Sequence, residues 1–151
     1  MSTDNAVMKK ENKTKLFLVD DDALFLKSLE IEFSQQNEFE IETFATGEQC
    51  IARLSENPDV IILDYNLDSV QKDAMDGLST LNRIKSFNPA IPVIMLSAQD
   101  KIEVAVSCMR HNAFDYVVKS ETAFIRLQRI ISKITHYQKI EKQLNWYMDR
   151  M

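Results

Sequence analysis

The sequence contains only two glycines in 151 residues, Gly47 and Gly77. Phosphate-binding loops of the P-loop kind and dinucleotide-binding loops need several closely spaced glycines, so the sequence excludes both. It also has no apolar run near the roughly 18 residues that a membrane-spanning helix needs, and its N-terminus lacks the apolar centre of a signal peptide. We therefore expect a cytoplasmic protein that does not contact a membrane.

Cysteine and histidine are also scarce. The two cysteines, Cys50 and Cys108, both fall in stretches with helical periodicity. We expect two buried, reduced thiols and no disulfide. The two histidines, His111 and His136, lie far apart in the sequence and near no pair of cysteines, which leaves a zinc site without support.

Apolar residues make up 45% of the chain and charged residues 27%, which is typical of one globular domain of this length. The net charge is −5, but residues 121–151 carry +3 and the remainder therefore carries −8. A mainly acidic surface repels nucleic acid, so we expect no direct nucleic-acid binding by this chain.

Five apolar stretches alternate with helical ones along the chain. The predicted strands are residues 15–19, 38–44, 59–64, 92–97 and 113–119. The predicted helices are residues 23–36, 46–57, 77–87, 100–112 and about 121 to the end. Alternation of this kind is typical of parallel strands joined by crossover helices in a three-layer α/β sheet. Residues 1–13 are predicted to be a flexible tail and residues 65–76 a polar loop.

Polar side chains follow four of the predicted strands. The first strand is followed by three aspartates, and the third, fourth and fifth end in Asp64, Ser97 and Lys119. Because the carboxyl ends of parallel strands lie at one edge of the sheet, we expect these groups to lie together. Clustered carboxylates require a cation, and oxygen ligands with open positions suit Mg²⁺. A lysine opposite them favours a further anion, such as a phosphoryl group carried by one aspartate.

Five short motifs carry a resemblance to a known family. They are "LVDDD" at 18–22, "IILDYN" at 61–66, "MDG" at 75–77, "VIMLSA" at 93–98 and "DYVVK" at 115–119. In this order the set resembles a response-regulator receiver domain, the phosphoacceptor half of a two-component system. The resemblance implies a flavodoxin-like doubly wound (βα)5 fold with strand order 2-1-3-4-5, over residues 14–135.

The resemblance also implies a role for each motif residue. Asp64 is the implied phosphoacceptor, and Mg²⁺ is held by Asp20, Asp21, Asp64 and the backbone carbonyl of Asn66. The phosphoryl group is contacted by Ser97 and Lys119, and the aromatic residue that follows Ser97 inward is Tyr116. A histidine kinase or phosphotransfer protein is the implied partner, and the fourth helix, fifth strand and fifth helix form the implied output face. The domain is then a signalling module and not an enzyme, although it assists its own phosphorylation and dephosphorylation.

Two departures from the family pattern yield further predictions. Ser120 stands where the family usually has a proline, so we expect a trans Lys119–Ser120 bond, with Ser120 as the N-cap of the next helix. Asp64 and Gly77 are thirteen residues apart, several more than is typical of the family. We interpret the additional segment, residues 68–74, as a surface insertion, with a lid over Asp64 as the alternative.

Two other functions are weighed against phosphotransfer. A haloacid-dehalogenase-like phosphatase could use Asp20 and Asp22, but Leu24 replaces the expected Thr or Val and Asp64 would have no role. A receiver-like scaffold that never carries phosphate normally lacks part of the acid, hydroxyl and lysine set, which this chain keeps.

The C-terminal helix carries an apolar seam at alternating steps of three and four residues. The seam consists of Leu127, Ile130, Ile134, Tyr137, Glu141, Leu144, Met148 and Met151. Packing on the sheet explains its first part, but not the residues beyond about 137. Residues 136–151 are therefore predicted to be a helical extension that mediates homodimerisation or links to an absent effector. The face around the fourth helix is the other candidate dimer surface.

Overall fold

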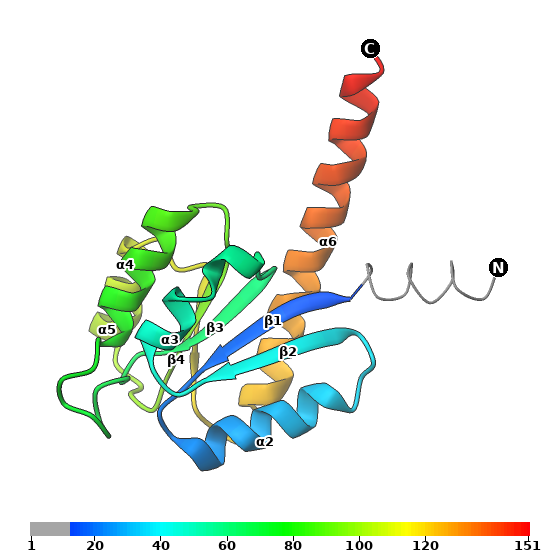
Figure 1. The fold of residues 1–151 in the computed structure, drawn as a ribbon. Helices are drawn as coiled ribbons and strands as arrows, with labels where there is room; N and C mark the ends of the chain where they lie inside the picture. Colours follow the sequence, from blue (N-terminus) through cyan, green and yellow to red (C-terminus); the bar gives the residue numbers. More distant parts are fainter. Residues whose placement is uncertain (1–12) are drawn as a thin grey trace.

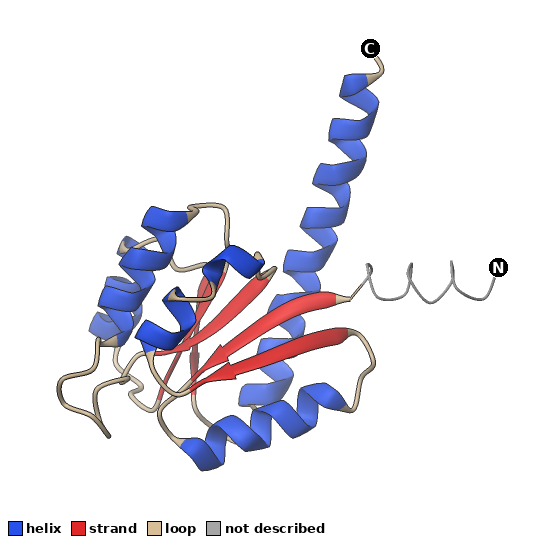
Figure 2. Ribbon diagram, in the orientation of Figure 1, coloured by secondary structure: helices blue, strands red, loops and turns tan. Residues whose placement is uncertain are grey.

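In the computed structural model, which describes residues 13–151, five parallel strands form one sheet with helices on both faces (Figures 1 and 2). The strand order β2-β1-β3-β4-β5 confirms the predicted flavodoxin-like fold. The strands are β1 (Thr14–Val19), β2 (Phe39–Phe44), β3 (Val60–Asp64), β4 (Val93–Ser97) and β5 (Asp115–Val118). The predicted tail, residues 1–13, lies outside the described residues except for its last position.

Within residues 13–151, five α-helices and one short 3-10 helix connect and cover the strands. They are α2 (Ala23–Ser34), α3 (Gly47–Ile51), η1 (Leu54–Glu56), α4 (Gly77–Phe87), α5 (Ile102–Arg110) and α6 (Ala123–Asp149). The prediction of one helix over residues 46–57 is wrong, because the α-helix ends at Ile51 and a 3-10 turn follows. Asn57 then adopts a left-handed conformation with φ 59°, directly before Pro58, which disfavours helical geometry in the residue preceding it.

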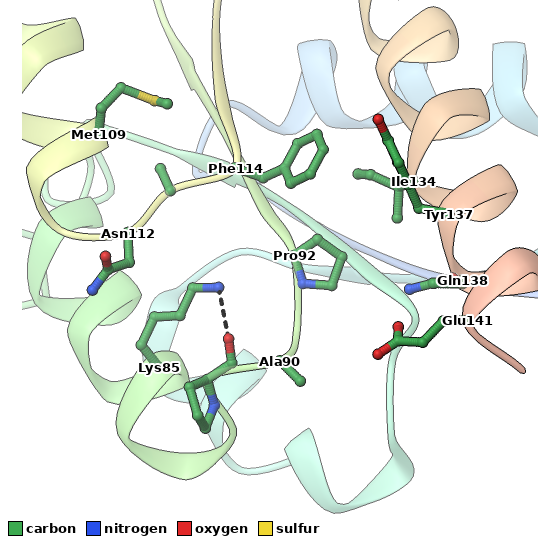
Figure 3. A pocket seen from close by; sticks show the side chains of 12 residues that line it. Lys85, Ala90, Pro92, Met109, Asn112, Phe114, Ile134, Tyr137, Gln138 and Glu141 are labelled. Atoms are coloured by element: carbon green, nitrogen blue, oxygen red, sulfur yellow. Dashed lines mark hydrogen bonds between the residues drawn. The ribbon is translucent and has the colours of Figure 1, made fainter. Parts of the chain in front are cut away.

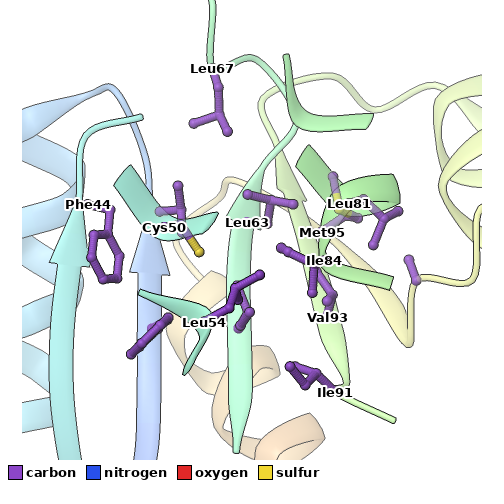
Figure 4. Packing of buried hydrophobic residues seen from close by; sticks show 14 of the residues in the cluster. Phe44, Cys50, Leu54, Leu63, Leu67, Leu81, Ile84, Ile91, Val93 and Met95 are labelled. Carbon is purple, nitrogen blue, oxygen red and sulfur yellow. The ribbon is translucent and has the colours of Figure 1, made fainter. Parts of the chain in front are cut away.

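The strand residues alternate between two apolar layers. Leu16 and Leu18 of β1 pack with α2 and α6, whereas Phe17 and Val19 pack on the opposite face with α3, α4 and α5. Figure 4 shows the second layer, in which side chains from β3 and β4 meet Leu81 and other residues of α4. Both Cys50 and Cys108 are free and buried in this layer, as predicted. With both faces covered, β3 and β4 are buried at every residue, including their polar ends.

The parallel registers bring the polar strand ends to one edge of the sheet. Asp64, the last residue of β3, pairs with Leu96 of β4, and Ser97 pairs with Val118 of β5. Backbone bonds continue beyond the strands, since the amide of Lys119 donates to the carbonyl of Ser97 at 2.7 Å. Backbone hydrogen bonds therefore continue along this edge of the sheet, and they fix the positions of the side chains attached to it.

The segment after Lys119 follows one prediction and contradicts another. The Lys119–Ser120 bond is trans, as predicted, since residues 13–151 contain no cis peptide. Ser120 is not the N-cap, however, because α6 begins at Ala123 and Thr122 precedes it without a side-chain cap. The amide of Ala123 instead donates to the carbonyl of Ser120 at 3.1 Å, so a turn delays the start of the helix.

Helix α6 changes surroundings along its length. Its first half packs on the sheet through Leu127, Ile130, Ile131 and Ile134, which are buried, as predicted. The second half projects past the sheet (orange to red in Figure 1), and residues 139–151 are all exposed. Within residues 13–151, every helix is too short or too polar to span a membrane.

Candidate acidic site at the carboxyl edge of the sheet

Three carboxylates gather where β1 and β3 end. Asp20 and Asp64 are each 2% exposed, and Asp21 is half-buried beside them. Each carboxylate offers one oxygen, and these three oxygens all lie within 4.8 Å of one another. Three negative charges at this spacing in a partly dry site repel strongly, so the arrangement requires positive charge.

Lys119 supplies part of that charge from the end of β5. Its Nζ lies 2.9 Å from Asp20 Oδ2 and 3.5 Å from Asp64 Oδ1, and 4.8 Å from the centre of the Phe25 ring. Burial lowers the pKa of Lys119, but contact with Asp20 and then Asp64 raises it by more, so the net shift is upward. The lysine therefore stays a cation, yet one cation faces three carboxyl groups.

The charge deficit is visible at Asp64 and Asp20. Burial raises the pKa of Asp64 well above its usual range, and the charge of Asp20 raises it further, although Lys119 and the amide of Asn66 oppose this. Asp20 Oδ2 lies at ion-pair distance from the Lys119 ammonium. Among the buried side-chain nitrogen and oxygen atoms of residues 13–151, it is the one that has no hydrogen-bond partner. A divalent cation would satisfy both features, and the all-oxygen donor set fits Mg²⁺.

The cluster opens into a small cavity of about 260 Å³. Its lining residues are Asp21, Asp22, Asp64, Asn66, Asp68, Ser69, Ala98 and Lys119. Four of the predicted site residues thus share one cavity. Asp22 stands apart chemically, since its Oδ1 accepts from the amides of Leu24 and Phe25 and caps α2.

Ser97 and Tyr116 are not among the residues that line this cavity. Ser97 is fully buried, and its Oγ accepts from the amide of Gln99 at 3.1 Å. The hydroxyl of Tyr116 donates to the carbonyl of the same Gln99. Burial raises the pKa of Tyr116, and the Ser97 hydroxyl opposes that shift. The two predicted switch residues are therefore connected through Gln99, a residue that the sequence did not single out.

The loop between β3 and α4 is fastened to the site at its start. Leu67 is buried in the core, and the amides of Ser69 and Val70 each donate to Asp21 Oδ2 at 3.1 Å. The Ser69 hydroxyl donates to the same oxygen at 2.5 Å. Sequence reasoning missed Ser69, because a serine in a polar loop carries no signal of its tertiary partner. Residues 68–73 are exposed, in line with the surface insertion that the sequence indicated, and the start of this segment is also bonded to Asp21.

The end of the loop is equally constrained. The amide of Met75 lies 3.2 Å from both carboxylate oxygens of Glu48 on α3. A Cβ on Gly77 would lie 2.5 Å from the carbonyl oxygen of Asp64 and 2.6 Å from Tyr65 Cα. Only glycine therefore allows α4 to begin this close to the turn that presents Asp64.

A larger cavity of about 480 Å³ lies at the opposite, amino edge of the sheet (Figure 3). Pro92, Phe114 and Tyr137 line it, together with Lys85. The Lys85 ammonium donates to the carbonyls of Pro89 at 3.3 Å and Ile91 at 2.5 Å, and burial lowers its pKa. This lysine already closes the loop before β4, and the cavity brings together no acidic or nucleophilic cluster.

Comparison with known proteins identifies the family. Residues 16–134 match the family model described as "Response regulator receiver domain". The chain belongs to this family and is a receiver domain of the two-component response regulators.

The curated relatives are much longer proteins. The DNA-binding transcriptional regulator NtrC of Salmonella typhimurium is 34% identical over 104 residues, which are 68% of this chain but 21% of NtrC. The transcriptional regulatory protein ZraR of Escherichia coli is 33% identical over 99 residues, 65% of this chain and 21% of ZraR. This chain thus spans about a fifth of the length of these relatives.

Solved structures agree with this assignment. The receiver domain of NtrX from Brucella abortus superposes with a TM-score of 0.70 at 28% identity, covering 79% of this chain and 96% of that one. The CheX-CheY-BeF3-Mg complex from Borrelia burgdorferi gives a TM-score of 0.68 at 29% identity, covering 79% and 87%.

Proposed function

We propose that this chain receives a phosphoryl group on Asp64 from a histidine kinase or phosphotransfer protein and passes the signal to its own surface. The observation that carries the proposal is the placement of the Lys119 ammonium within 3.5 Å of both Asp20 and Asp64, in the lining of a cavity. A buried carboxylate flanked by a fixed cation and further acids is poorly explained by packing alone.

The chemistry needs one oxygen of Asp64 to attack the phosphorus of a phosphohistidine or of a small acyl phosphate. The new bond joins that oxygen to phosphorus, the bond from phosphorus to the donor breaks, and the donor leaves with the electron pair. Lys119 is placed to neutralise charge on the phosphoryl oxygens during transfer. The hydroxyl of Ser97 still has its proton available, because it accepts from Gln99 and does not donate to it.

Asp20, Asp21, Asp64 and the carbonyl of Asn66 would hold Mg²⁺. The bound ion would supply the positive charge that the three carboxylates lack and would also attract the phosphoryl oxygens. The carbonyl of Asn66 belongs to a residue that lines the cavity, and the amide of the same residue donates to Asp64 Oδ1 at 3.2 Å. This chain's part is to hold the oxygens in place before the ion arrives.

The signal would leave through Ser97 and Tyr116. When Ser97 turns toward the phosphoryl group, its contact with Gln99 changes, and Tyr116 is tied to the same residue. Tyr116 lies on β5, between α5 and α6, which correspond to the predicted fourth and fifth helices. We expect the face made by α5, β5 and α6 to be biased between two states.

The domain limits remain part of the proposal, with a receiver domain over residues 14–135 and an extension over 136–151. Exposed apolar side chains on the extension support self-association or attachment to an effector; they are Tyr137, Ile140, Leu144, Trp146, Tyr147, Met148 and Met151. The phosphatase alternative is not favoured, since Asp22 caps α2 and the family match is to receiver domains.

The test is labelling with acetyl phosphate and Mg²⁺, followed by intact mass measurement. We expect the wild-type chain to gain one phosphoryl group, and Asp64→Asn or chelation of the metal to abolish the gain. The matched control is Asp68→Asn, which removes a carboxylate from the same cavity and should leave labelling intact. Equal labelling of wild type and Asp64→Asn would show that another residue is the acceptor.

A further inference from the structure

The loop that follows β3 supplies three hydrogen-bond donors to one oxygen of the acidic cluster. Asp21 Oδ2 accepts from the amide of Ser69, the amide of Val70 and the hydroxyl of Ser69, at 3.1, 3.1 and 2.5 Å. These residues are 48 and 49 positions away from Asp21 in the sequence. Because all three donors meet Oδ2, the other oxygen of Asp21 is left for a cation.

The Ser69 hydroxyl also lies close to a second proposed metal ligand. Its Oγ is 3.3 Å from the carbonyl oxygen of Asn66 and 2.5 Å from Asp21 Oδ2. A hydroxyl has one proton, so the shorter contact with Asp21 takes it and the contact with Asn66 is weak. The Asn66 carbonyl therefore remains free to bind an ion while Asp21 stays held.

The chain is anchored on both sides of this contact. Leu67 is 1% exposed in the core, and the amide of Met75 lies between the two carboxylate oxygens of Glu48. Between these anchors, Gln71 and Ala74 form a turn through one backbone bond of 3.0 Å. The loop is thus anchored at both ends, and Ser69 has a defined place beside the acidic cluster.

We propose that Ser69 is a positioning residue for the magnesium site. Its hydroxyl fixes the side chain of Asp21 so that a single oxygen faces the ion. Hydrogen bonds from neighbouring groups to a ligating carboxylate fix its orientation, and losing such a partner typically weakens metal binding about 10- to 100-fold. Two backbone amides remain on Asp21 when only the hydroxyl is lost, so the lower end of that range applies. The inference rests on the proposed metal-dependent phosphorylation of Asp64.

The experiment titrates MgCl₂ into the ¹⁵N-labelled full chain and follows the amide shifts of Val70 and Asn66. Ser69→Ala is expected to raise the dissociation constant for Mg²⁺ about tenfold. Ser69→Thr keeps the hydroxyl, and its dissociation constant for Mg²⁺ is expected to lie within about twofold of the wild-type value. Gln71→Ala, an exposed position in the same loop, is the matched control and should bind Mg²⁺ as the wild type does.

A second readout separates positioning from chemistry. In labelling with acetyl phosphate, Ser69→Ala should require about tenfold more Mg²⁺ for half-maximal rate and should reach the wild-type rate at saturation. Unchanged or tighter Mg²⁺ binding by Ser69→Ala, failure of Ser69→Thr to restore it, or an equal loss in Gln71→Ala would each overturn the inference. Absence of Mg²⁺ binding by the wild type would instead contradict the proposed function itself.

Discussion

The amide of Lys119 donates to the carbonyl of Ser97 at 2.7 Å, so the two residues proposed to contact the phosphoryl group are joined through the backbone. The hydroxyl of Ser97 in turn accepts from Gln99, to which Tyr116 is also bonded. A rotation of the Ser97 side chain toward Asp64 therefore changes a contact that reaches β5 directly.

We predict that phosphorylation shifts amide signals of Ser97, Gln99 and Tyr116 together with those of α5 and α6. In Ser97→Ala the hydroxyl is absent, so the shifts should stay near Asp64 and the loop that follows it. Comparison of ¹H–¹⁵N spectra with and without acetyl phosphate measures this. Identical shifts on the α5 and α6 face in both proteins would exclude Ser97 as the coupling residue.

Asp64→Asn should stabilise the protein in the absence of a divalent cation. The pKa of Asp64 is raised on folding, so its ionisation costs stability once the pH exceeds the unfolded-state value of about 4. At pH 7 in EDTA we expect a gain of at least about 1 kcal/mol, since one pKa unit corresponds to about 1.4 kcal/mol.

Urea unfolding at pH 7 and pH 3 provides the measurement for this prediction. The gain should disappear near pH 3, where the carboxyl is protonated in both folded and unfolded states. Mg²⁺ should raise the stability of the wild type more than that of Asp64→Asn, because the ion binds the folded state through this carboxylate. A variant less stable than the wild type in EDTA at pH 7 would contradict the argument.

Gly77→Ala should impair both the fold and the site. The added Cβ would lie 2.5 Å from the backbone oxygen of Asp64, which cannot move without displacing the acceptor. We expect a loss of about 1–3 kcal/mol in the free energy of unfolding and slower labelling of the folded protein.

Gly47→Ala provides the control for Gly77→Ala, because its Cβ would meet the side chain of Thr80 and not the turn at Asp64. It should lower stability while leaving the labelling rate of the folded protein near the wild-type value. Labelling rates measured well below both melting temperatures distinguish the two variants. Equal rates in Gly77→Ala and the wild type would show that the turn tolerates the displacement.

We predict that the two buried cysteine thiols make the protein less stable at alkaline pH. Burial raises the pKa of Cys50 to about 12 and that of Cys108 to about 11. Both folded values lie above the unfolded value of about 8.5, so the thiols do not reduce the free energy of unfolding below pH 8.5. Above that pH the unfolded thiols ionise first, and the free energy of unfolding falls by about 1.4 kcal/mol per thiol and pH unit.

A Cys50→Ala, Cys108→Ala double variant isolates this contribution from other titrating groups. Its stability should fall less steeply than that of the wild type between pH 8.5 and 10.5 in urea unfolding. In the wild type, a thiol reagent at pH 8 should label neither cysteine until urea unfolds the chain. Parallel pH profiles for the two proteins would refute the prediction.

The exposed half of α6 predicts weak dimerisation. Tyr137, Leu144, Met148 and Met151, the last apolar members of the predicted seam, are all exposed, and the seam's steps of three and four residues are the spacing of a coiled coil. Two heptads are short, so we expect a Kd of roughly 50 µM, or about −6 kcal/mol.

Sedimentation of the full chain tests the dimer directly. Leu144→Glu should abolish association, whereas Asn145→Glu, one residue away from the seam, should not. Truncation after Thr135 should also give a monomer. If the wild type is itself monomeric at about 100 µM, with and without phosphorylation, attachment to an effector becomes the better explanation of these apolar residues.

The alternation of strands and helices and the acidic edge were predictable from local sequence features, whereas the sheet order followed from the resemblance to receiver domains. Unbroken apolar runs such as residues 60–63 are typical of strands covered on both faces, and the motif order then predicted where Asp64, Ser97 and Lys119 would meet. The alternation and the acidic edge depend on local periodicity and on the rule that parallel strands end at one edge of the sheet.

Contacts between distant loops required the folded chain. Nothing near Ser69 indicates that it binds Asp21, because an exposed hydroxyl in a polar loop has many possible partners and only the path of the loop selects one. The start of α6 at Ala123, rather than after Ser120, was likewise decided by a backbone turn. Sequence periodicity specifies which residues are buried and in which elements, whereas the partners of exposed polar groups depend on how those elements and loops are arranged in space.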